Sequence, residues 1–279
     1  MDELLKKIKK EQKRVKKKIG YTPNILEPQT LCEKILWNKF FDRSKLLVTT
    51  SDKVEVKKYV EEMWGKDIVI PNLFVGEPED IPFSSLPERY VIKPNHTSGR
   101  VIFATEDKVL MGLTGAIEGG RTKINRGDIT KTCEKWLKER YGTEKFEWAY
   151  QEIERKILIE PMISVPAPAN YNFYMFNGKC EFLYVIHGRY TDGYAKVCYD
   201  TDWNRTPFQL EKRSFDYPKP KELDKMVRIA EVLSKPFRFV RVDLYRTDRI
   251  YFGELTHYPT SGAMNFSDKE WDLKLGGKV

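Results

Sequence analysis

The sequence lacks long apolar runs, clustered cysteines and internal repeats. No stretch among its 279 residues approaches the roughly 20 consecutive apolar positions that a membrane-spanning helix needs, and the N-terminus lacks the apolar run of a secretory signal. We therefore expect a cytoplasmic protein. The four cysteines lie far apart, with no CxxC or Cys/His spacing, so the sequence indicates neither a zinc site nor a disulfide framework.

What the sequence does contain is a basic N-terminal segment. Residues 1–19 hold nine Lys or Arg side chains against three acidic ones, which accounts for +6 of the net charge of +8. Leu4, Ile8, Val15 and Ile19 lie near helical spacing, so the segment could form an amphipathic helix on the anionic inner surface of the membrane. The alternative, a helix that packs one thin apolar stripe on the body, is the commoner arrangement. Nucleic acid is not an expected partner, because no basic patch with interleaved aromatics recurs downstream.

Helical and extended patterns follow one another irregularly along the chain. Apolar residues at helical spacing, together with cap signals, predict helices over 28–42, 51–65, 127–142 and 220–235. Runs of β-branched residues bounded by turn signals predict strands over 67–71, 89–94, 98–105 and 155–163, and hairpins over 171–189 and 241–256. Asn177-Gly178 is the strongest hairpin signal among them. The pattern predicts an α+β fold with antiparallel hairpins rather than regular βαβ alternation.

The hairpin over 241–256 places two carboxylates on one face of a sheet. Side chains alternate along a strand, so Arg241 and Asp243 share a face. With a two-residue loop at 248–249, Asp243 lies directly opposite Glu254, where like charges are destabilising. A divalent cation would relieve this repulsion, and magnesium commonly takes one or two protein carboxylates plus phosphate oxygens. The alternative is that Arg241 itself neutralises the pair, and a three-residue loop would break the pairing.

A lysine at the end of a predicted strand gives a candidate phosphate site. The strand ends at Lys93 and gives way to Pro94 and then to a loop of small and polar residues with one glycine, Gly99. An ammonium beside such a loop suits phosphate, because the lysine acts as a point charge while loop N–H groups surround the oxygens. Taken alone, the sequence is more often that of a simple turn. A second candidate loop, 111–123, has four glycines and no clear period.

Several segments in a fixed order resemble one protein family. They are SDKVEVKKYV, YVIKPNHTSG, KILIEPMI, YNFYMFNGK, and RVDLY followed by IYFGELT and SG. Their order and relative positions resemble those of ATP-grasp enzymes, and most closely those of the TupA-like ATP-grasp family, which is associated with teichuronopeptide and other surface-polysaccharide biosynthesis. The resemblance covers about residues 28–276 and is carried by the ordered occurrence of the motifs rather than by any single one.

The resemblance implies an ATP-grasp fold, in which two α+β subdomains clamp ATP. The implied divisions are a basic helical extension over 1–27, a helical N-terminal region over 28–75, a lid subdomain over 76–160 and a core subdomain with the metal site over 161–279. The part before Lys53 is too small for the complete α/β domain that usually precedes the grasp in carboxylate-amine ligases, so acceptor recognition is the least transferable feature.

The same resemblance assigns the nucleotide contacts. Lys53 and Lys93 would reach the ATP phosphates, and the loop 94–100 would close over them. Residues 160–163 would form the hinge that reads adenine through backbone groups, with Glu160 taking the amino group or a ribose hydroxyl. Lys156 is a further phosphate candidate whose alternative is a solvated strand end. The expected nucleotide-binding residues are therefore Lys53, Lys93, His96, Thr97, Ser98, Gly99, Lys156, Glu160, Pro161, Met162 and Ile163.

The resemblance also implies the metal and catalytic residues. Asp243 and Glu254 would bind magnesium, and Arg241 would face the transferring phosphoryl group, so Arg241 and Lys93 are the expected catalytic residues. ATP-grasp ligases commonly place Asn two residues after the metal-binding Glu, where this chain has Thr256. A third protein ligand could come from the Thr256 hydroxyl, His257 or Asn265.

The implied activity is ATP- and magnesium-dependent ligation of an amine, such as an amino acid, to a carboxylate, such as a uronic acid of a surface glycan. The reaction would pass through an acyl phosphate and needs no nucleophilic side chain, in agreement with the lack of a convincing Ser/His/Asp or Cys/His set. The alternatives are a kinase that phosphorylates a sugar or other hydroxyl, and a non-catalytic nucleotide- or glycan-binding protein.

Candidate acceptor residues follow the Asn-Gly hairpin. They are His187, Arg189, Asp202 and Trp203. An arginine can grip a substrate carboxylate in a bidentate manner, and a tryptophan can stack on a sugar ring. A structural role is the alternative for each of these, with Trp203 in the core, Asp202 in a turn and Arg189 in a surface ion pair.

Overall fold

Two five-stranded antiparallel sheets form the framework of the protein. The computed structural model describes residues 2–105, 109–113, 125–164, 167–188, 193–210 and 216–279. The first sheet has the strand order β1-β5-β2-β3-β4 and contains β1 (Phe74–Gly76), β2 (Arg89–Pro94), β3 (Val101–Thr105), β4 (Val109–Leu113) and β5 (Ile157–Pro161). The second sheet has the order β10-β9-β6-β7-β8 and contains β6 (Asn170–Phe176), β7 (Lys179–His187), β8 (Ala195–Tyr199), β9 (Phe239–Arg246) and β10 (Ile250–Thr256).

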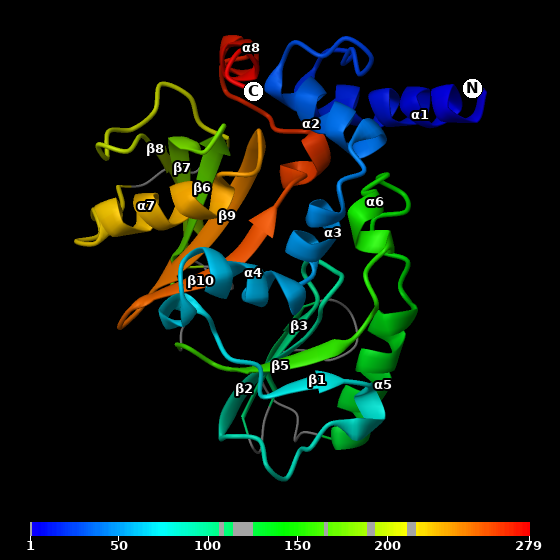
Figure 1. Cartoon of the computed structure of the whole chain (residues 1–279), viewed down its shortest axis with the longest axis vertical. Coiled ribbons are helices and arrows are strands. Elements are labelled where there is room, and N and C mark those ends of the chain that lie inside the picture. The colour runs from blue at the N-terminus through cyan, green and yellow to red at the C-terminus, as the bar shows by residue number, and fades with distance from the viewer. Residues whose placement is uncertain (1, 106–108, 114–124, 165–166, 189–192, 211–215) are drawn as a thin grey trace.

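Helices surround both sheets, and some of them lie between the sheets. In the described part of the chain they are α1 (Asp2–Ile19), α2 (Leu31–Phe41), α3 (Lys45–Ser51), α4 (Glu55–Met63), α5 (Arg126–Lys138), α6 (Trp148–Gln151), α7 (Leu223–Ser234) and α8 (Glu270–Gly276). Short 3-10 turns are η1 (Lys66–Ile68), η2 (Pro78–Asp80) and η3 (Pro259–Gly262). In Figure 1 the first sheet lies in the lower half with α5, the second sheet lies in the upper half with α7, and α3 and α4 lie between them. The expected α+β class is confirmed.

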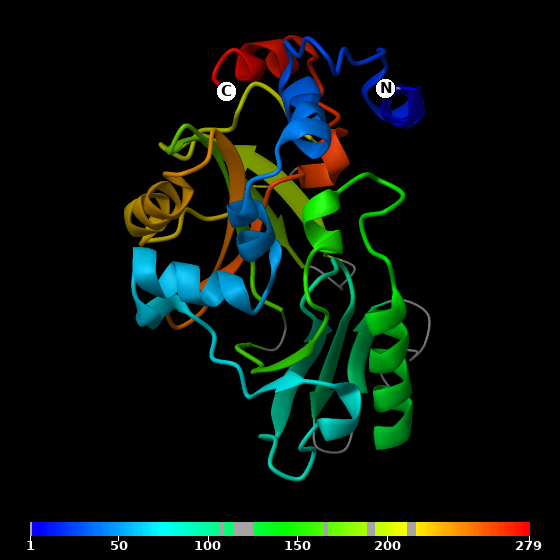
Figure 2. The same ribbon diagram turned by 45° about the vertical axis from the view of Figure 1, so that its right-hand side comes forward.

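One face of the first sheet packs against α5, and the opposite face points toward the second sheet. Along β2 the side chains of Tyr90 and Ile92 are buried, whereas those of Val91 and Lys93 are half-buried on the opposite face. Tyr90 and Ile92 join Ile129 of α5 in a separate small core, and Figure 2 shows α5 alongside this sheet. The alternation therefore directs Lys93 away from the core.

The second sheet holds the larger core. Its central strand β6 is buried at all of its positions. On the neighbouring β9, Val240, Val242 and Leu244 are fully buried in the core that α7 also joins. Arg241 and Asp243 lie on the opposite face by strand alternation. The sheet thus presents polar groups on one face only.

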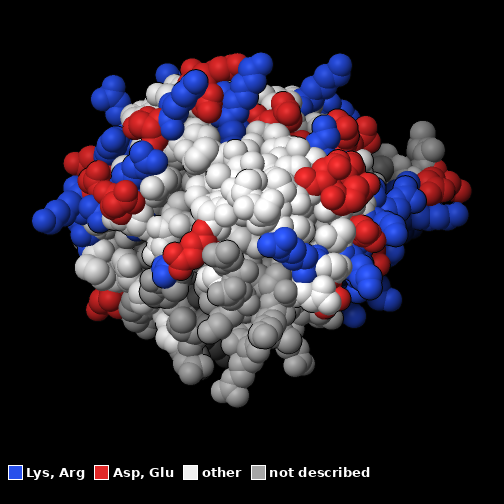
Figure 3. Space-filling model, turned by 90° about the horizontal axis from the view of Figure 1, so that it is seen from below, with Lys and Arg blue, Asp and Glu red and all other residues white. Residues whose placement is uncertain are grey.

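The basic helix α1 packs on the body of the second sheet. Its buried residues are Ile8, Glu11, Val15 and Ile19, and the three apolar ones belong to the same core as β6 and β9. The structure therefore shows the packed helix of the two alternatives, because Ile8, Val15 and Ile19 of the apolar stripe are covered by the protein itself, although Leu4 at its start is exposed. The helix projects beyond the body in Figure 1, and Lys and Arg side chains gather at the corresponding edge in Figure 3.

Two predicted elements are wrong in extent or type. The helix predicted over 51–65 begins only at Glu55, because Ser51 ends the separate helix α3 and the Asp52 carboxylate turns the chain by accepting the Val54 N–H. The segment 67–71 is not a strand: it begins within η1 and pairs with no strand, although its apolar residues are buried. The segment was mistaken for a strand because its buried residues are apolar in the same way as those of a buried strand.

The other predicted elements are confirmed, with ends that differ by a few residues. These are the helices α2, α5 and α7, the strands β2, β3 and β5, and the hairpins β6–β7 and β9–β10. Asn177 and Gly178 both have positive φ, 49° and 78°, as the tight hairpin turn requires. The strands β1, β4 and β8 were not predicted. No helix in the described ranges is both long and apolar enough to cross a membrane.

Candidate functional site

A cavity of about 350 Å³ lies between the two sheets. The first sheet supplies its wall from β2, β3 and the end of β5, and the second sheet supplies it from β9 and β10. Of the residues that the structure describes, five cationic side chains line it, against three carboxylates. The cations are Lys53, Lys57, Lys93, Arg100 and Arg241, and the carboxylates are Glu160, Asp243 and Glu254. An excess of positive charge in a half-enclosed space favours an anionic ligand.

The two carboxylates of the β9–β10 hairpin lie opposite one another, but by a route that differs from the prediction. The loop is formed by the three residues 247–249, because Arg246 pairs with Ile250. A β-bulge at Gly253 then shifts the register by one residue, and the shift brings Glu254 opposite Asp243. The expected opposition is confirmed, and the predicted two-residue loop is wrong.

Arg241 holds this pair of carboxylates. Its Nε and Nη2 atoms lie 2.6 Å from the two oxygens of Asp243, and Nη2 also lies 3.0 Å from Glu254 Oε1. Asp243 is 2% exposed. Burial raises the pKa of its carboxyl, Arg241 opposes the rise, and the Glu254 carboxylate adds to it. In the structure, therefore, Arg241 itself forms ion pairs with both carboxylates, which is the alternative considered for this hairpin.

Oxygen donors at this position fit a hard cation. Asp243 and Glu254 offer carboxylate oxygens, and the Thr256 hydroxyl donates to Glu254 Oε1 at 3.0 Å. Within the described ranges no group of three or more His, Cys, Asp and Glu side chains could hold a metal ion. Magnesium needs no such group, since it takes one or two carboxylates and completes its shell with phosphate oxygens and water. The donor set therefore fits magnesium bound together with a nucleotide, and Arg241 would have to give up part of its contact.

The other two ligand candidates lie elsewhere. His257 is buried, and its Nε2 atom is 2.8 Å from Thr50 Oγ1 on α3. Asn265 is exposed on the surface. None of the three candidates lines the cavity, but Thr256 alone of the three donates to a carboxylate of the pair.

A second ionic group lies across the cavity. Glu160 is 4% exposed and forms ion pairs with Lys57 and with Lys93, whose Nζ atom is 2.6 Å from Glu160 Oε2. Burial alone would raise the pKa of the Glu160 carboxyl, but the two ammonium groups outweigh it and lower the pKa. Lys57 was not among the site residues predicted from the sequence. Its position one turn after Lys53, at the start of α4, is the signal that could have identified it.

The loop after β2 lines the cavity through three of its predicted residues. Thr97, Ser98 and Gly99 face it, and the Lys53 ammonium donates to the Thr97 carbonyl. Gly99 has φ +76° with no atom within 4 Å of the position of a Cβ, so backbone conformation rather than space requires glycine. Among the described residues, the buried Thr97 hydroxyl has no hydrogen-bond partner.

Asn95 and His96 support this loop from beneath. Asn95 Nδ2 donates to both Asp52 oxygens at 3.0 Å and to the Glu154 carbonyl at 2.8 Å. His96 is fully buried, and its Nε2 atom lies 3.3 Å from the Glu139 carbonyl. Burial lowers the pKa of His96 to about 4. His96, predicted as a nucleotide contact, does not line the cavity.

The predicted hinge connects the two sheets. Pro161, Met162 and Ile163 line the cavity together with apolar residues of the first sheet, among them Val91 and Phe103. The Met162 N–H donates to the Arg89 carbonyl. An apolar slot beside exposed backbone suits a flat base. Lys156, the additional phosphate candidate, instead lies 3.1 Å from Glu154 Oε1 and does not line the cavity.

The described acceptor candidates His187, Asp202 and Trp203 do not line the cavity. Asp202 lies in a turn where its N–H donates to Asp200 Oδ1, and Trp203 stacks on Tyr199 with ring centroids 4.4 Å apart. Trp203 Nε1 also donates to the Tyr217 carbonyl. Asp202 and Trp203 thus take the structural roles that were their alternatives. Arg189 lies outside the described residues, as do residues 114–123 of the candidate loop 111–123.

Comparison with known proteins identifies a family for most of the chain. The family described as TupA-like ATPgrasp matches residues 33–279. No curated protein matches the chain. Among solved structures, the D-alanine–D-alanine ligase of Bacillus anthracis complexed with ATP is 16% identical, with a TM-score of 0.42 over 75% of this chain and 54% of that one.

Two further solved structures show similar values. The D-alanine–D-alanine ligase of Helicobacter pylori is 13% identical, with a TM-score of 0.45 over 83% of this chain and 59% of that one. The D-cycloserine synthetase DcsG is 13% identical, with a TM-score of 0.43 over 84% of this chain and 71% of that one. The chain thus spans little more than half of the length of the two D-alanine ligases.

Proposed function

This chain belongs to the TupA-like ATP-grasp family, and on that premise we propose that it is an ATP- and magnesium-dependent ligase that joins a carboxylate to an amine. Its fold is the α+β ATP-grasp fold, with the two antiparallel sheets facing each other across the cavity. One observation carries the proposal. Residues from α4, the loop after β2, β5, β9 and β10 converge on one cavity that combines a carboxylate pair with five cations.

The nucleotide would lie along this cavity with adenine at one end and the phosphates at the other. The apolar slot at 161–163 would take adenine, and Glu160 would accept from its amino group or from a ribose hydroxyl. Lys53, Lys93 and the Thr97 hydroxyl would contact the phosphates. Because Lys57 and Lys93 are paired with Glu160, the phosphates would compete for these ammonium groups and partly replace the carboxylate as their partner.

The reaction has two steps. First, an oxygen of the acceptor carboxylate bonds to the γ-phosphorus while the bond from that phosphorus to the β–γ bridging oxygen breaks, which releases ADP. Then the amine nitrogen bonds to the acyl carbon, phosphate leaves with the electron pair of the C–O bond, and the amine loses a proton to solvent. Arg241 and Lys93 would stabilise the charge that develops on the transferring group, since phosphoryl transfer depends on positioning and electrostatics.

Asp243 and Glu254, with Thr256 beside them, would hold magnesium, which when bound would neutralise β- and γ-phosphate charge. Arg241 lies within reach of both carboxylates. It can therefore exchange one carboxylate contact for a phosphoryl oxygen without leaving its place on β9.

For the substrates we propose an amine, such as an amino acid, and a carboxylate, such as a uronic acid of a surface polysaccharide or capsule. Support comes from the association of this family with such biosynthesis. The protein would work in the cytoplasm, close to the inner face of the membrane. Contact with anionic lipid would be mainly electrostatic and would use the exposed lysines of α1, because Ile8, Val15 and Ile19 of its apolar stripe are already packed.

The deciding experiment is incubation with magnesium-ATP and paired panels of uronic acids and amino acids. A ligase releases ADP and phosphate only when both partners are present, and it yields an amide. ADP with a phosphorylated acceptor would show a kinase instead, and absence of magnesium-ATP binding in calorimetry would favour a non-catalytic role. Asp243→Asn and Glu254→Gln should each abolish turnover, and wild-type rates in either variant would contradict the metal assignment.

A further inference from the structure

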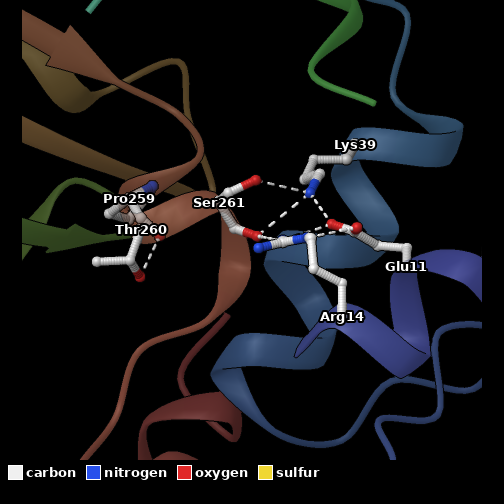
Figure 4. Close-up of polar contacts among 6 residues, drawn as sticks. All are labelled: Glu11, Arg14, Lys39, Pro259, Thr260 and Ser261. Carbon is white, nitrogen blue, oxygen red and sulfur yellow. Dashed lines mark hydrogen bonds and ion pairs between the residues drawn. The ribbon is translucent and has the colours of Figure 1, made fainter. Parts of the chain in front are cut away.

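A buried ionic cluster joins the first two helices to the turn that follows β10. Its members are Glu11 and Arg14 of α1 and Lys39 of α2, and we refer to them as the clamp. Glu11 and Lys39 are each 1% exposed. Arg14 donates to both oxygens of Glu11 at 2.7 Å, and Lys39 forms an ion pair with the same carboxylate. Figure 4 shows the three side chains converging from the two helices.

The clamp holds one residue on the other side, Ser261. Arg14 Nη2 donates to the Ser261 carbonyl at 2.9 Å, and Lys39 Nζ donates to the same carbonyl at 3.2 Å. Lys39 Nζ also lies 2.9 Å from Ser261 Oγ. One buried and one half-buried cation therefore point at a single backbone position, as the dashed lines of Figure 4 show.

The backbone that the clamp holds is unusual. Thr260 and Ser261 have φ of 49° and 57°, and Gly262 follows with φ 74°. Left-handed backbone is rare for residues other than glycine, above all for a β-branched one, and persists only where the surroundings impose it. A Cβ on Gly262 would lie 2.8 Å from Leu36 of α2. The turn is therefore pressed against α2 on one side and held by the clamp on the other.

This turn continues the strand that carries the site carboxylate. Asn170 is the first residue of β6 after the hinge, and it pairs with Tyr245 of β9. Tyr245 therefore lies at the hinge end of the sheet, and Arg241 lies further from the hinge on the same strand. On β10 the same direction passes Glu254 and leads to the turn at 259–262. The clamp thus fixes the chain beyond the carboxylate pair, at the end of the site remote from the predicted adenine slot.

A second segment lies next to the clamp. Burial raises the pKa of the Glu147 carboxyl, and the neighbouring Ser261, Lys39 and Arg14 oppose the rise, so this carboxyl lies beside the clamp. The Glu147 N–H donates to the Gly142 carbonyl. The clamp and Ser261 are therefore adjacent to the segment 141–150 as well as to the turn at 259–262.

Stability alone does not account for such a cluster. Burying charges carries a desolvation cost, and apolar side chains of similar volume usually stabilise a core at least as well. What the charged groups provide here is a defined position for a backbone carbonyl, which apolar packing would not fix.

We propose that Glu11, Arg14 and Lys39 are positioning residues for the acceptor amine. This inference rests on the proposed ligase function. The clamp holds the turn at 259–262 and, through Glu147, the segment 141–150, so that the amine rather than water reaches the acyl phosphate. The basic N-terminal helix is thereby part of the machinery of the site rather than only an extension of the body.

The test uses the full-length double variant Glu11→Gln/Lys39→Met beside Lys39→Met alone. Removing both charges avoids leaving Glu11 buried without Lys39, so the double variant should recover much of the thermal stability that Lys39→Met loses. Neither variant can donate from position 39 to Ser261. A matched control is Lys7→Met, which removes a lysine of the same helix that pairs with Glu3 on the surface.

Coupling between ATP use and amide formation is the first readout. In the folded double variant the amide formed per ADP should fall by about tenfold, while the KM for ATP should change by less than about twofold, because a small displacement on the acceptor side affects only the second step. Lys7→Met should couple as the wild type does. A folded double variant with wild-type coupling would overturn the proposal.

Amide hydrogen exchange gives a second readout that does not depend on activity. Exchange at 260–263 should be about tenfold faster in the double variant, with exchange in β6 unchanged. Unchanged exchange in the turn of the folded variant would overturn the role of the clamp. If the wild-type protein formed no ADP with any acceptor pair, the proposed function would fail, and the exchange result would still decide whether the clamp holds the turn.

Discussion

At the scale of single residues, Arg241 explains how two carboxylates can face each other on one sheet. Its fork spans Asp243 and reaches Glu254 at the same time. A lysine could not make these contacts, because its ammonium is a point charge without the planar fork. The residue that stabilises the pair is thus also the residue that a bound cation would displace.

This arrangement predicts a magnesium response that needs no nucleotide. Arg241→Met should lower the free energy of unfolding by about 3 kcal/mol, because Asp243 is left buried without its partner. Added magnesium should then raise the melting temperature of this variant more than that of the wild type. Scanning calorimetry with and without magnesium measures both effects. Arg249→Met, at an exposed loop position, is the control, and an equal magnesium response in all three proteins would count against the site.

His96 predicts a pH dependence of stability. Burial lowers its pKa from 6.5 to about 4, the hydrogen bond to the Glu139 carbonyl opposes the shift, and Arg155 and Lys53 reinforce it. As the pH falls, His96 is therefore protonated at a higher pH in the unfolded chain than in the folded protein. The contribution of neutral His96 is complete above pH 6.5 and is lost between pH 6.5 and about 4. The loss is of the order of 3 kcal/mol.

Urea unfolding of His96→Gln between pH 7 and about 4 tests this prediction. The variant should lose stability less steeply with acid than the wild type does. A His96 variant with an unchanged slope would show that other groups carry the acid sensitivity.

At the scale of elements, the β9–β10 hairpin shows what a sequence pattern can and cannot predict. Alternation along each strand was sufficient to place Asp243 and Glu254 on one face. The loop length was not predictable, since 247–249 carries no strong turn pair, and the bulge at Gly253 compensates for it. A Cβ at Gly253 would lie 2.9 Å from the Tyr245 ring and 3.0 Å from the Asp243 carbonyl.

Gly253→Ala should therefore disturb the opposition of the carboxylates. We expect a loss of about 1–2 kcal/mol of stability, because neither the ring nor the backbone can move away freely, and a weaker response to magnesium-ATP in calorimetry. Gly277→Ala is the matched control, since a Cβ there meets only ordinary contacts of 3.4 Å or more. Equal stability of the two variants would mean that the bulge does not depend on glycine.

Other parts of the candidate site show the same division between local pattern and tertiary context. Lys93, Thr97, Ser98 and the residues 160–163 line the cavity because they lie at or just after the ends of two strands whose positions the sequence predicts. Lys57 lies within the recognised segment 51–60 and Arg100 at the end of the loop 94–100, but neither was predicted as a site residue, since only the packing of their segments brings them to the cavity. The roles of all these side chains stay predictions until they are tested.

At the scale of the whole molecule, the N-terminal helices and the second sheet form one body. Apolar residues of α1, α2 and β6–β10 share one core, whereas the first sheet has its own core with α5. Sequence patterns did not predict this, because the partner of each apolar stripe is chosen only when distant segments pack. The predicted division into four segments likewise stays a prediction.

The packed stripe of α1 leads to a prediction about membranes. Binding to anionic vesicles should depend on charge alone, so that about 0.5 M salt abolishes it. Replacing the exposed Lys9, Lys13 and Lys16 by Gln should abolish it as well. Ile8→Ala should instead cost about 2 kcal/mol of stability without weakening vesicle binding, since Ile8 is buried in the body. Co-sedimentation measures the binding, and binding that survives high salt would indicate an inserted apolar face.

The pairing of β1 with β5 bears on how the two halves can move. The chain enters the first-sheet half just before β1 and leaves it just after β5, and these strands are neighbours, with Phe74 opposite Ile159. Between α5 and β5 the chain also returns to the other half, where α6 packs beside α3 and Ala149 joins the core of the second sheet. The first-sheet half is therefore attached at two separated places, the β1–β5 edge and α6. A rotation about the β1–β5 edge that widened the cavity would also have to shift or detach α6, so the packing of α6 would limit how far the two sheets can separate.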